Sequence, residues 1–135
     1  MLVSKIMTAA LAHTYEEPDI DNILTRNLTV PLINLGIAEL TAAENAYRVN
    51  KGVEELTEPV TVEKPEDDVQ YDYHITTILL PLWLAWKIFE GLDDTQRAES
   101  YRILFEQRKA DLVPVVWNEM QDFNNGCTGW CCHET

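Results

Sequence analysis

Basic residues, glycine and cysteine are all scarce in this sequence of 135 residues. Ten Lys and Arg stand against 23 Asp and Glu, which gives a formal net charge of −13. Such a surface repels phosphate backbones and disfavours nucleic-acid binding through a basic patch. It does not exclude proximity to DNA, because a surface that DNA slides past, or one that imitates DNA, would be acidic for the same electrostatic reason.

The few cysteines all lie in the last nine residues, at Cys127, Cys131 and Cys132. The N-terminal residues do not resemble a secretory signal, and an odd number of cysteines then indicates reduced thiols rather than a disulfide framework. With His133 they form the one cluster of metal-ligand residue types, but its spacing matches no standard zinc motif. We therefore expect no metal and no other cofactor, and interpret this end as an interaction tail or an incidental terminus.

Motifs of catalytic sites are missing as well. The sequence has no Gly-rich phosphate loop, no HExxH and no pair of carboxylates in an apolar frame. His13, His74 and His133 are scattered, and none has a serine or cysteine beside it as a nucleophile with its base. We expect a protein that is not an enzyme and interpret His74 as a partly buried structural residue. A small helical enzyme would need a concave pocket with perturbed titratable groups, and the sequence shows no sign of one.

Long hydrophobic runs are also absent. The longest, from Ile75 to Trp86, has about twelve residues, whereas a membrane-spanning helix needs roughly twenty. We therefore expect no contact with a membrane. The stretch 71–92 is nonetheless apolar on nearly every side at helical spacing, which predicts the central helix of a small bundle at about 71–91. Asp72 is expected to cap this helix, and Pro81 to disturb it near Leu80.

Three further helices are predicted from apolar spacing and capping residues, at Leu2–His13, about Thr29–Asn50 and about Asp94–Val113. Between the second and the central helix, residues 53–69 alternate Val60 and Val62 with polar residues between two prolines. This pattern indicates one extended arm or a short β segment on the surface. The predicted fold is an all-α bundle of about four helices at 1–113, with this arm inserted, followed by a C-terminal helix or extended tail at 114–135.

Asn34 stands among apolar neighbours on the second predicted helix. Its amide would serve either a hydrogen bond to another helix or subunit, or an exposed or capped position. The sequence leaves both interpretations open.

The order of the elements carries one further signal. The second helix contains Leu32-Ile33-Asn34 and Ala38-Glu39-Leu40, and the central helix contains Tyr73, Leu80-Pro81, Leu84-Ala85 and Ile88. An acidic turn then leads into a last helix with aromatic residues near its middle. Over residues 2 to 113 this arrangement resembles the head-to-tail connector, or neck adaptor, proteins of tailed bacteriophages. The segment after Pro114 matches no part of that pattern.

The resemblance implies a structural virion protein. It implies an α-helical subunit, about twelve copies of which form a closed ring beneath the portal protein. Such a ring joins the capsid to further neck or tail proteins and leaves a channel for DNA passage. The subunit would be assembled in the host cytoplasm and end in the neck of the virion.

A closed ring is built from two different, complementary patches on each subunit. Residues 53–69 and the tail are the segments least able to fold on themselves, so we expect contacts with neighbouring subunits or partners at Val60, Val62, Trp117 and Trp130. An acidic channel wall would keep the DNA backbone from adhering. We expect that wall to include Glu54, Glu55, Glu58, Glu66, Asp67 and Asp68. The alternative function is a small acidic DNA-mimic inhibitor of a nucleic-acid-binding protein, expected as a monomer or dimer.

Overall fold

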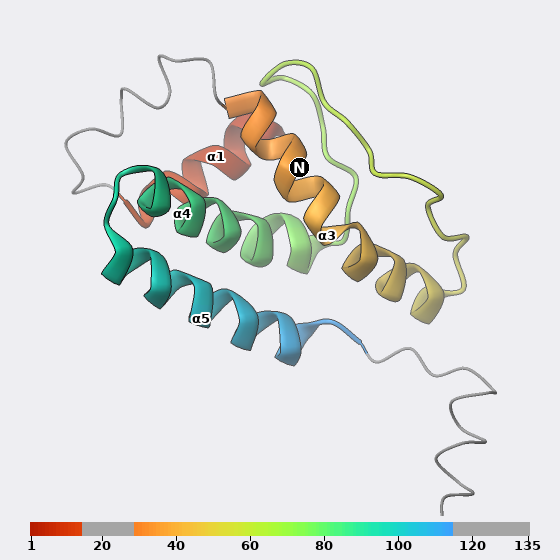
Figure 1. Ribbon diagram of the computed structural model, residues 1–135. Helices are drawn as coiled ribbons and strands as arrows, with labels where there is room; N and C mark the ends of the chain where they lie inside the picture. Colours follow the sequence, from red (N-terminus) through yellow and green to blue (C-terminus); the bar gives the residue numbers. More distant parts are fainter. Residues whose placement is uncertain (15–28, 115–135) are drawn as a thin grey trace, which may run out of the picture.

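The computed structural model describes residues 1–14 and 29–114. Its helical elements are α1 (Val3–Ala12), α3 (Thr29–Lys51), the π-helical segment η1 (Ile75–Leu79), α4 (Leu80–Gly91) and α5 (Thr95–Leu112). Helix α4 contacts α1, α3 and α5, and in Figure 1 it lies between α3 and α5. The predicted all-α bundle is thus confirmed for the described residues. None of their helices is long and apolar enough to cross a membrane.

Helix α4 is buried on most of its surface. Eight of its twelve residues are buried, so it must be enclosed by other elements rather than lie on one side of them. Its large side chains, such as Leu84 and Phe89, each contribute roughly 1.5–3 kcal/mol when fully buried. Helix α1 adds Val3, Ile6 and Met7 to the same core. The apolar segment therefore provides much of the hydrophobic stabilisation of the fold.

The central helix begins and changes pitch where the sequence predicts. The carboxylate of Asp72 accepts a hydrogen bond from the backbone N–H of His74 at 3.0 Å, as a helix cap does. Pro81 has no N–H, and its ring would crowd the carbonyl four residues before it. The backbone widens into the π-helical turn η1 just before this proline, and the N–H of Leu80 bonds the carbonyl of Ile75.

A short turn reverses the chain between α4 and α5. Asp93 adopts a left-handed conformation with φ 61°, and the carboxylate of Asp94 accepts from the N–H of Arg97 at 3.1 Å to cap α5. Aromatic contacts between Phe89 and Tyr101, among others, join the two helices. Only two α5 residues, Ala98 and Phe105, are buried. Packing against α4 leaves Leu104 and Arg108 of α5 exposed.

Helix α3 ends as predicted, with Gly52 in the left-handed conformation at φ 74°. The N–H of Gly52 bonds the carbonyl of Val49, and that of Val53 bonds Arg48, which is a Schellman motif. Residues 53–69 then run along the bundle (Figure 1) without forming a strand; an isolated bridge joins Leu2 to Asp68. The interpretation as a β segment is wrong, because side chains of α3 take the place of a partner strand.

Two asparagines on α3 bind this segment. The amide of Asn34 donates to the carbonyl of Val62 at 2.9 Å and accepts from its N–H at 2.8 Å. Asn45 makes the same pair of bonds with Leu56, at 3.1 and 2.7 Å. Eleven residues are about three helical turns, so both amides lie on one face of α3. The open question about Asn34 is thus settled: its partner is the backbone of the 53–69 segment.

Candidate functional site

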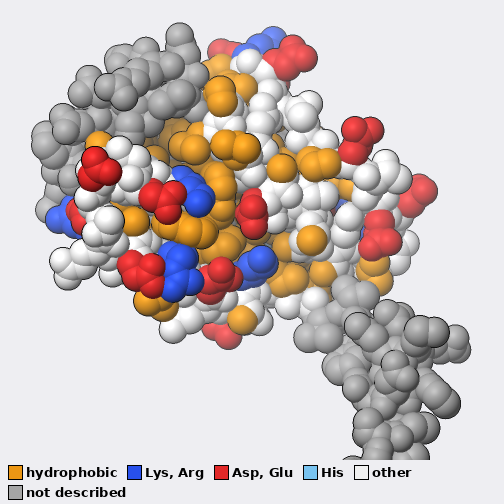
Figure 2. Space-filling view, viewed as in Figure 1, with side chains coloured by type: hydrophobic (Ala, Val, Ile, Leu, Met, Phe, Trp, Pro, Cys, Tyr) orange, Lys and Arg blue, Asp and Glu red, His pale blue; other side chains and the backbone are white. Residues whose placement is uncertain are grey.

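The acidic segment formed by residues 53–69 is the most distinctive surface that the structure describes. It carries seven acidic residues and one basic residue, Lys64. Among the predicted channel residues, Glu54, Glu55, Glu58 and Glu66 are exposed. In Figure 2 acidic side chains stand out along the side of the molecule where this segment runs. The bonds from Asn34 and Asn45 fix the backbone that presents these carboxylates to solvent.

The other two predicted channel residues, Asp67 and Asp68, serve the fold. Asp67 accepts from the backbone N–H of Glu63 at 2.7 Å, and this bond holds the pKa of its carboxyl below the usual value. Asp68 lies 2.8 Å from the amino group of Met1, and that hydrogen bond lowers its pKa as well. Both carboxylates remain partly accessible to solvent, but each already binds a donor group within its own chain.

The predicted contact residues fall in different places. Val62 is 4% exposed and belongs to the core of its own chain, and Val60 packs half-buried against that core. Both therefore help to attach the acidic segment to the bundle. Trp117 and Trp130 lie outside the described residues, as do Cys127, Cys131, Cys132 and His133.

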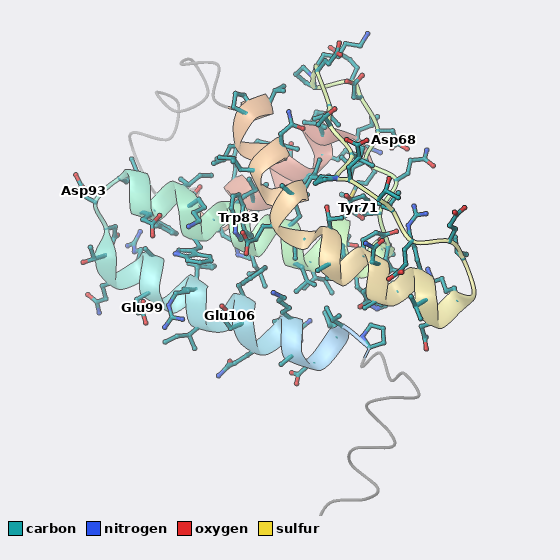
Figure 3. All side chains as sticks on the ribbon, turned by 45° about the vertical axis from the view of Figure 1, so that its right-hand side comes forward. Asp68, Tyr71, Trp83, Asp93, Glu99 and Glu106 are labelled. Carbon is teal, nitrogen blue, oxygen red and sulfur yellow. The ribbon has the colours of Figure 1, made fainter. Side chains whose placement is uncertain are left out.

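Large apolar side chains are exposed on two helices, α3 and α5. Leu35 on α3 is 62% exposed and Ile103 on α5 is 44% exposed. Helices α3 and α5 flank α4 in Figures 1 and 3, where Glu99 and Glu106 mark the α5 side. The two helices also differ in the charge around them. Helix α5 has four basic and three acidic residues, whereas the acidic segment 53–69, which is bound to α3, has seven acidic residues and one basic residue. The subunit thus presents two unlike surfaces.

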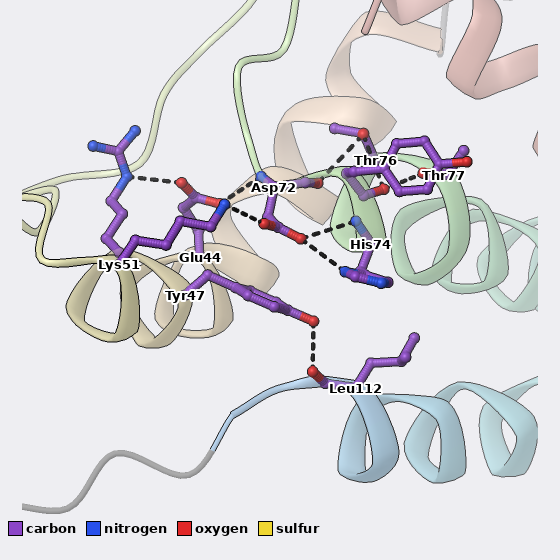
Figure 4. Close-up of polar contacts among 10 residues, drawn as sticks. Glu44, Tyr47, Lys51, Asp72, His74, Thr76, Thr77 and Leu112 are labelled. Carbon is purple, nitrogen blue, oxygen red and sulfur yellow. Dashed lines mark hydrogen bonds and ion pairs between the residues drawn. The ribbon is translucent and has the colours of Figure 1, made fainter.

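A buried polar network ties the end of α3 to the start of the central helix (Figure 4). Glu44, only 4% exposed, accepts from the side chain of Arg48 and from the backbone N–H of Asp72, each at 2.7 Å. The Asp72 carboxylate in turn lies 2.6 Å from Lys51 and 3.1 Å from His74. A pocket of about 220 Å³ opens beside these groups. Because every charge in the network has a partner, we interpret it as a structural clamp.

Two pKa shifts describe this clamp. Burial acts to raise the pKa of Asp72, but hydrogen bonds from Lys51 and His74 outweigh it and leave the pKa below the usual value. Burial, with the nearby charge of Asp72, raises the pKa of Tyr47. The Tyr47 hydroxyl donates to the carbonyl of Leu112 at 2.6 Å and so connects α3 to the end of α5. Neither shift brings a group into the range of a proton-transfer catalyst near neutral pH.

No family model, curated protein or solved structure matches this chain. Within residues 1–14 and 29–114, no three His, Cys, Asp or Glu side chains are arranged to hold a metal ion.

Several of these contacts escape sequence reasoning. The i, i+4 spacing of Glu44 and Arg48 was a signal for an ion pair on a helix. The spacing of eleven between Asn34 and Asn45 was a signal for one polar face.

The residues that carry the resemblance to phage connectors lie mostly in the core. Those buried include Ile33, Leu40 and the α4 residues Leu80, Pro81, Leu84, Ala85 and Ile88, whereas Tyr73 is 71% exposed.

Proposed function

We propose that this protein is a structural subunit of a closed ring, the head-to-tail connector of a tailed bacteriophage. The ring lies beneath the portal protein in the virion neck, contacts further neck or tail proteins and leaves a channel for DNA. It is not an enzyme in this proposal, and it needs no cofactor. The proposal combines the resemblance in residues 2 to 113 with the surfaces of the folded subunit.

The observation that carries the proposal is that α3 and α5, the two helices that flank α4, each expose a large apolar side chain. A ring needs a heterologous interface, in which one patch of a subunit contacts a different patch of the next. Leu35 on α3 and Ile103 on α5 supply such a pair, being 62% and 44% exposed. Exposed apolar groups on both sides favour association in a ring over a monomer, since water is excluded at each contact.

The acidic segment supports the same function through its charge. In the ring we expect Glu54, Glu55, Glu58 and Glu66 to face the channel, where they repel the phosphate backbone of passing DNA. A channel wall must also hold its shape while DNA moves through it. The paired bonds of Asn34 with Val62 and of Asn45 with Leu56 attach the segment at two points.

Light scattering with size-exclusion chromatography tests the assembly. We expect the chain to form a ring of about twelve copies with the portal protein of the same source. Leu35→Lys and Ile103→Lys each place a charge in the proposed interface and should abolish the ring. Thr8→Lys adds the same charge at an exposed polar position of α1, away from both proposed interface residues, and should leave the ring intact. A monomer that ignores the portal, and instead displaces DNA from a basic protein, would support the acidic inhibitor.

DNA binding tests the channel wall. Once rings form, the triple variant Glu54→Lys, Glu55→Lys and Glu58→Lys should retain DNA with an affinity that falls steeply as salt rises. Glu90→Lys changes an exposed carboxylate on α4, outside the acidic segment, and is the matched control for one reversal. Equal DNA binding by Glu55→Lys and Glu90→Lys rings would show that the acidic segment does not face the channel.

A further inference from the structure

An apolar groove of about 410 Å³ lies beside α5, away from the clamp. Its described lining comes from the end of α1, the π-helical turn, α4 and α5: His13, Thr77, Ile78, Leu82, Leu104 and Arg108. Three of these side chains are aliphatic, and two are basic in type. Leu104 is a large hydrophobic side chain left 38% exposed by the packing of α5. A groove of this size and composition is typical of a binding site for an apolar group.

We propose that residues 115–135 of the same chain occupy this groove, with Trp117 as the anchor. The segment follows α5 directly, so that it starts roughly two helical turns beyond Arg108. Its apolar residues Val116, Trp117, Met120 and Phe123 recur at positions that one side of an amphipathic segment would share. Trp is a favoured anchor because it brings a large rigid apolar surface and one N–H donor.

Charge complementarity supports this occupant. Residues 115–135 contain Glu119, Asp122 and Glu134 but no lysine or arginine. Arg108 stands at the groove with no ion pair among the described residues. It lies next to Leu104 on the helix surface, so one occupant would contact both an apolar and a cationic group. An acidic segment with apolar residues between its carboxylates fits that combination.

The tether makes even a weak contact effective. A short covalent connection gives an effective concentration in the millimolar range, so a contact with an intrinsic dissociation constant of about 100 µM would be formed in roughly nine molecules of ten. The inference concerns the free subunit and holds whether or not it forms a ring.

The cysteines provide a direct test in the full chain, because all three lie in the proposed occupant. In the Cys131→Ser, Cys132→Ser background, a fluorophore on Cys127 reports the rotational freedom of the segment through its anisotropy. We expect Leu104→Asp and Arg108→Glu each to lower the anisotropy to the value of a freely tethered dye. Trp117→Ala should have the same effect. Gln107→Glu, which matches the charge change of Leu104→Asp on an exposed α5 residue outside the groove lining, should not.

Charge reversal separates docking from a general effect on α5. Adding Glu119→Arg and Asp122→Arg to Arg108→Glu should restore the high anisotropy. If neither groove substitution changes the anisotropy of the fluorophore, the proposal is wrong. An anisotropy that falls when the protein is diluted would also overturn it, because the segment would then be bound to a second copy of the chain. Faster tryptic cleavage after Arg26 in the Leu104→Asp variant, with anisotropy unchanged, would assign the groove to residues 15–28 instead.

Discussion

Replacing Gly36 by alanine tests the closest approach between α3 and the central helix. A Cβ at this position would lie 2.5 Å from Cδ1 of Leu80 and 2.9 Å from Cε3 of Trp83. Both neighbours are buried, at 0% and 5% exposure, so neither can move aside without disturbing the core. Overpacking of this kind costs roughly 1–3 kcal/mol. Alanine regains about 1 kcal/mol of helix propensity over glycine. We therefore expect a net loss of roughly 0–2 kcal/mol in the free energy of unfolding.

The matched control is Gly91→Ala. A Cβ there meets nothing within 4 Å, and the residue belongs to a helix as Gly36 does. We expect a gain of roughly 0.5 kcal/mol, because alanine lowers the conformational entropy of the unfolded chain. Urea denaturation of both variants at equal concentration measures the difference. A Gly36→Ala variant as stable as Gly91→Ala would refute the tight packing of α3 against Leu80 and Trp83.

Three more contacts make separate predictions. Asn34→Ala removes both bonds to Val62 and should destabilise the fold by roughly 1–3 kcal/mol, with faster hydrogen exchange at the Val62 N–H that Asn34 binds. Tyr47→Phe removes the bond to Leu112, so we expect a loss of roughly 0.5–1.5 kcal/mol and faster hydrogen exchange at the end of α5. Asp72 has a folded pKa below its unfolded value of 3.8, so it contributes stability above that pH and loses it as the pH falls through the folded pKa. Asp72→Asn should therefore be less stable at pH 7 and lose less stability than wild type on acidification.

These predictions share one control. Glu39 is exposed on α3, and Glu39→Ala should change the free energy of unfolding by no more than about 0.5 kcal/mol. Unchanged hydrogen exchange at the Val62 N–H in Asn34→Ala would show that Asn34 does not hold the acidic segment. Equal rates of hydrogen exchange at the end of α5 in Tyr47→Phe and wild type would show that the bond from Tyr47 to Leu112 does not hold this end. Parallel acid unfolding curves for Asp72→Asn and wild type would contradict the lowered pKa.

Most helix positions follow from local sequence signals. Helix α3 ends at Gly52, because glycine adopts the left-handed conformation readily. Helix α5 begins after Asp94, because the side chain of Asp94 caps its first turn. Pro81 predicts the place of the irregularity in the central helix. It does not predict a π-helical turn, because the widening also depends on how the neighbouring helices pack.

The environment of the 53–69 segment is beyond such signals. Val62 is buried because Asn34, 28 residues earlier in the chain, binds its backbone. Alternation of apolar and polar residues is the same for an edge strand and for a segment bound by side chains, so the sequence does not separate the two. From its residue type alone, Glu44 is expected on the surface. Its burial is possible because the side chain of Arg48 and the backbone N–H of Asp72 bind its carboxylate. The apolar groove likewise joins elements that are distant in sequence, from His13 to Arg108.

The most direct test of the proposed connector is the mass of the full chain in solution, alone and with the portal protein of the same source. The account predicts a portal-dependent ring of about twelve copies, lost in both Leu35→Lys and Ile103→Lys and kept in Thr8→Lys. A chain that stays monomeric beside the portal, with the same mass in all three variants, would contradict it.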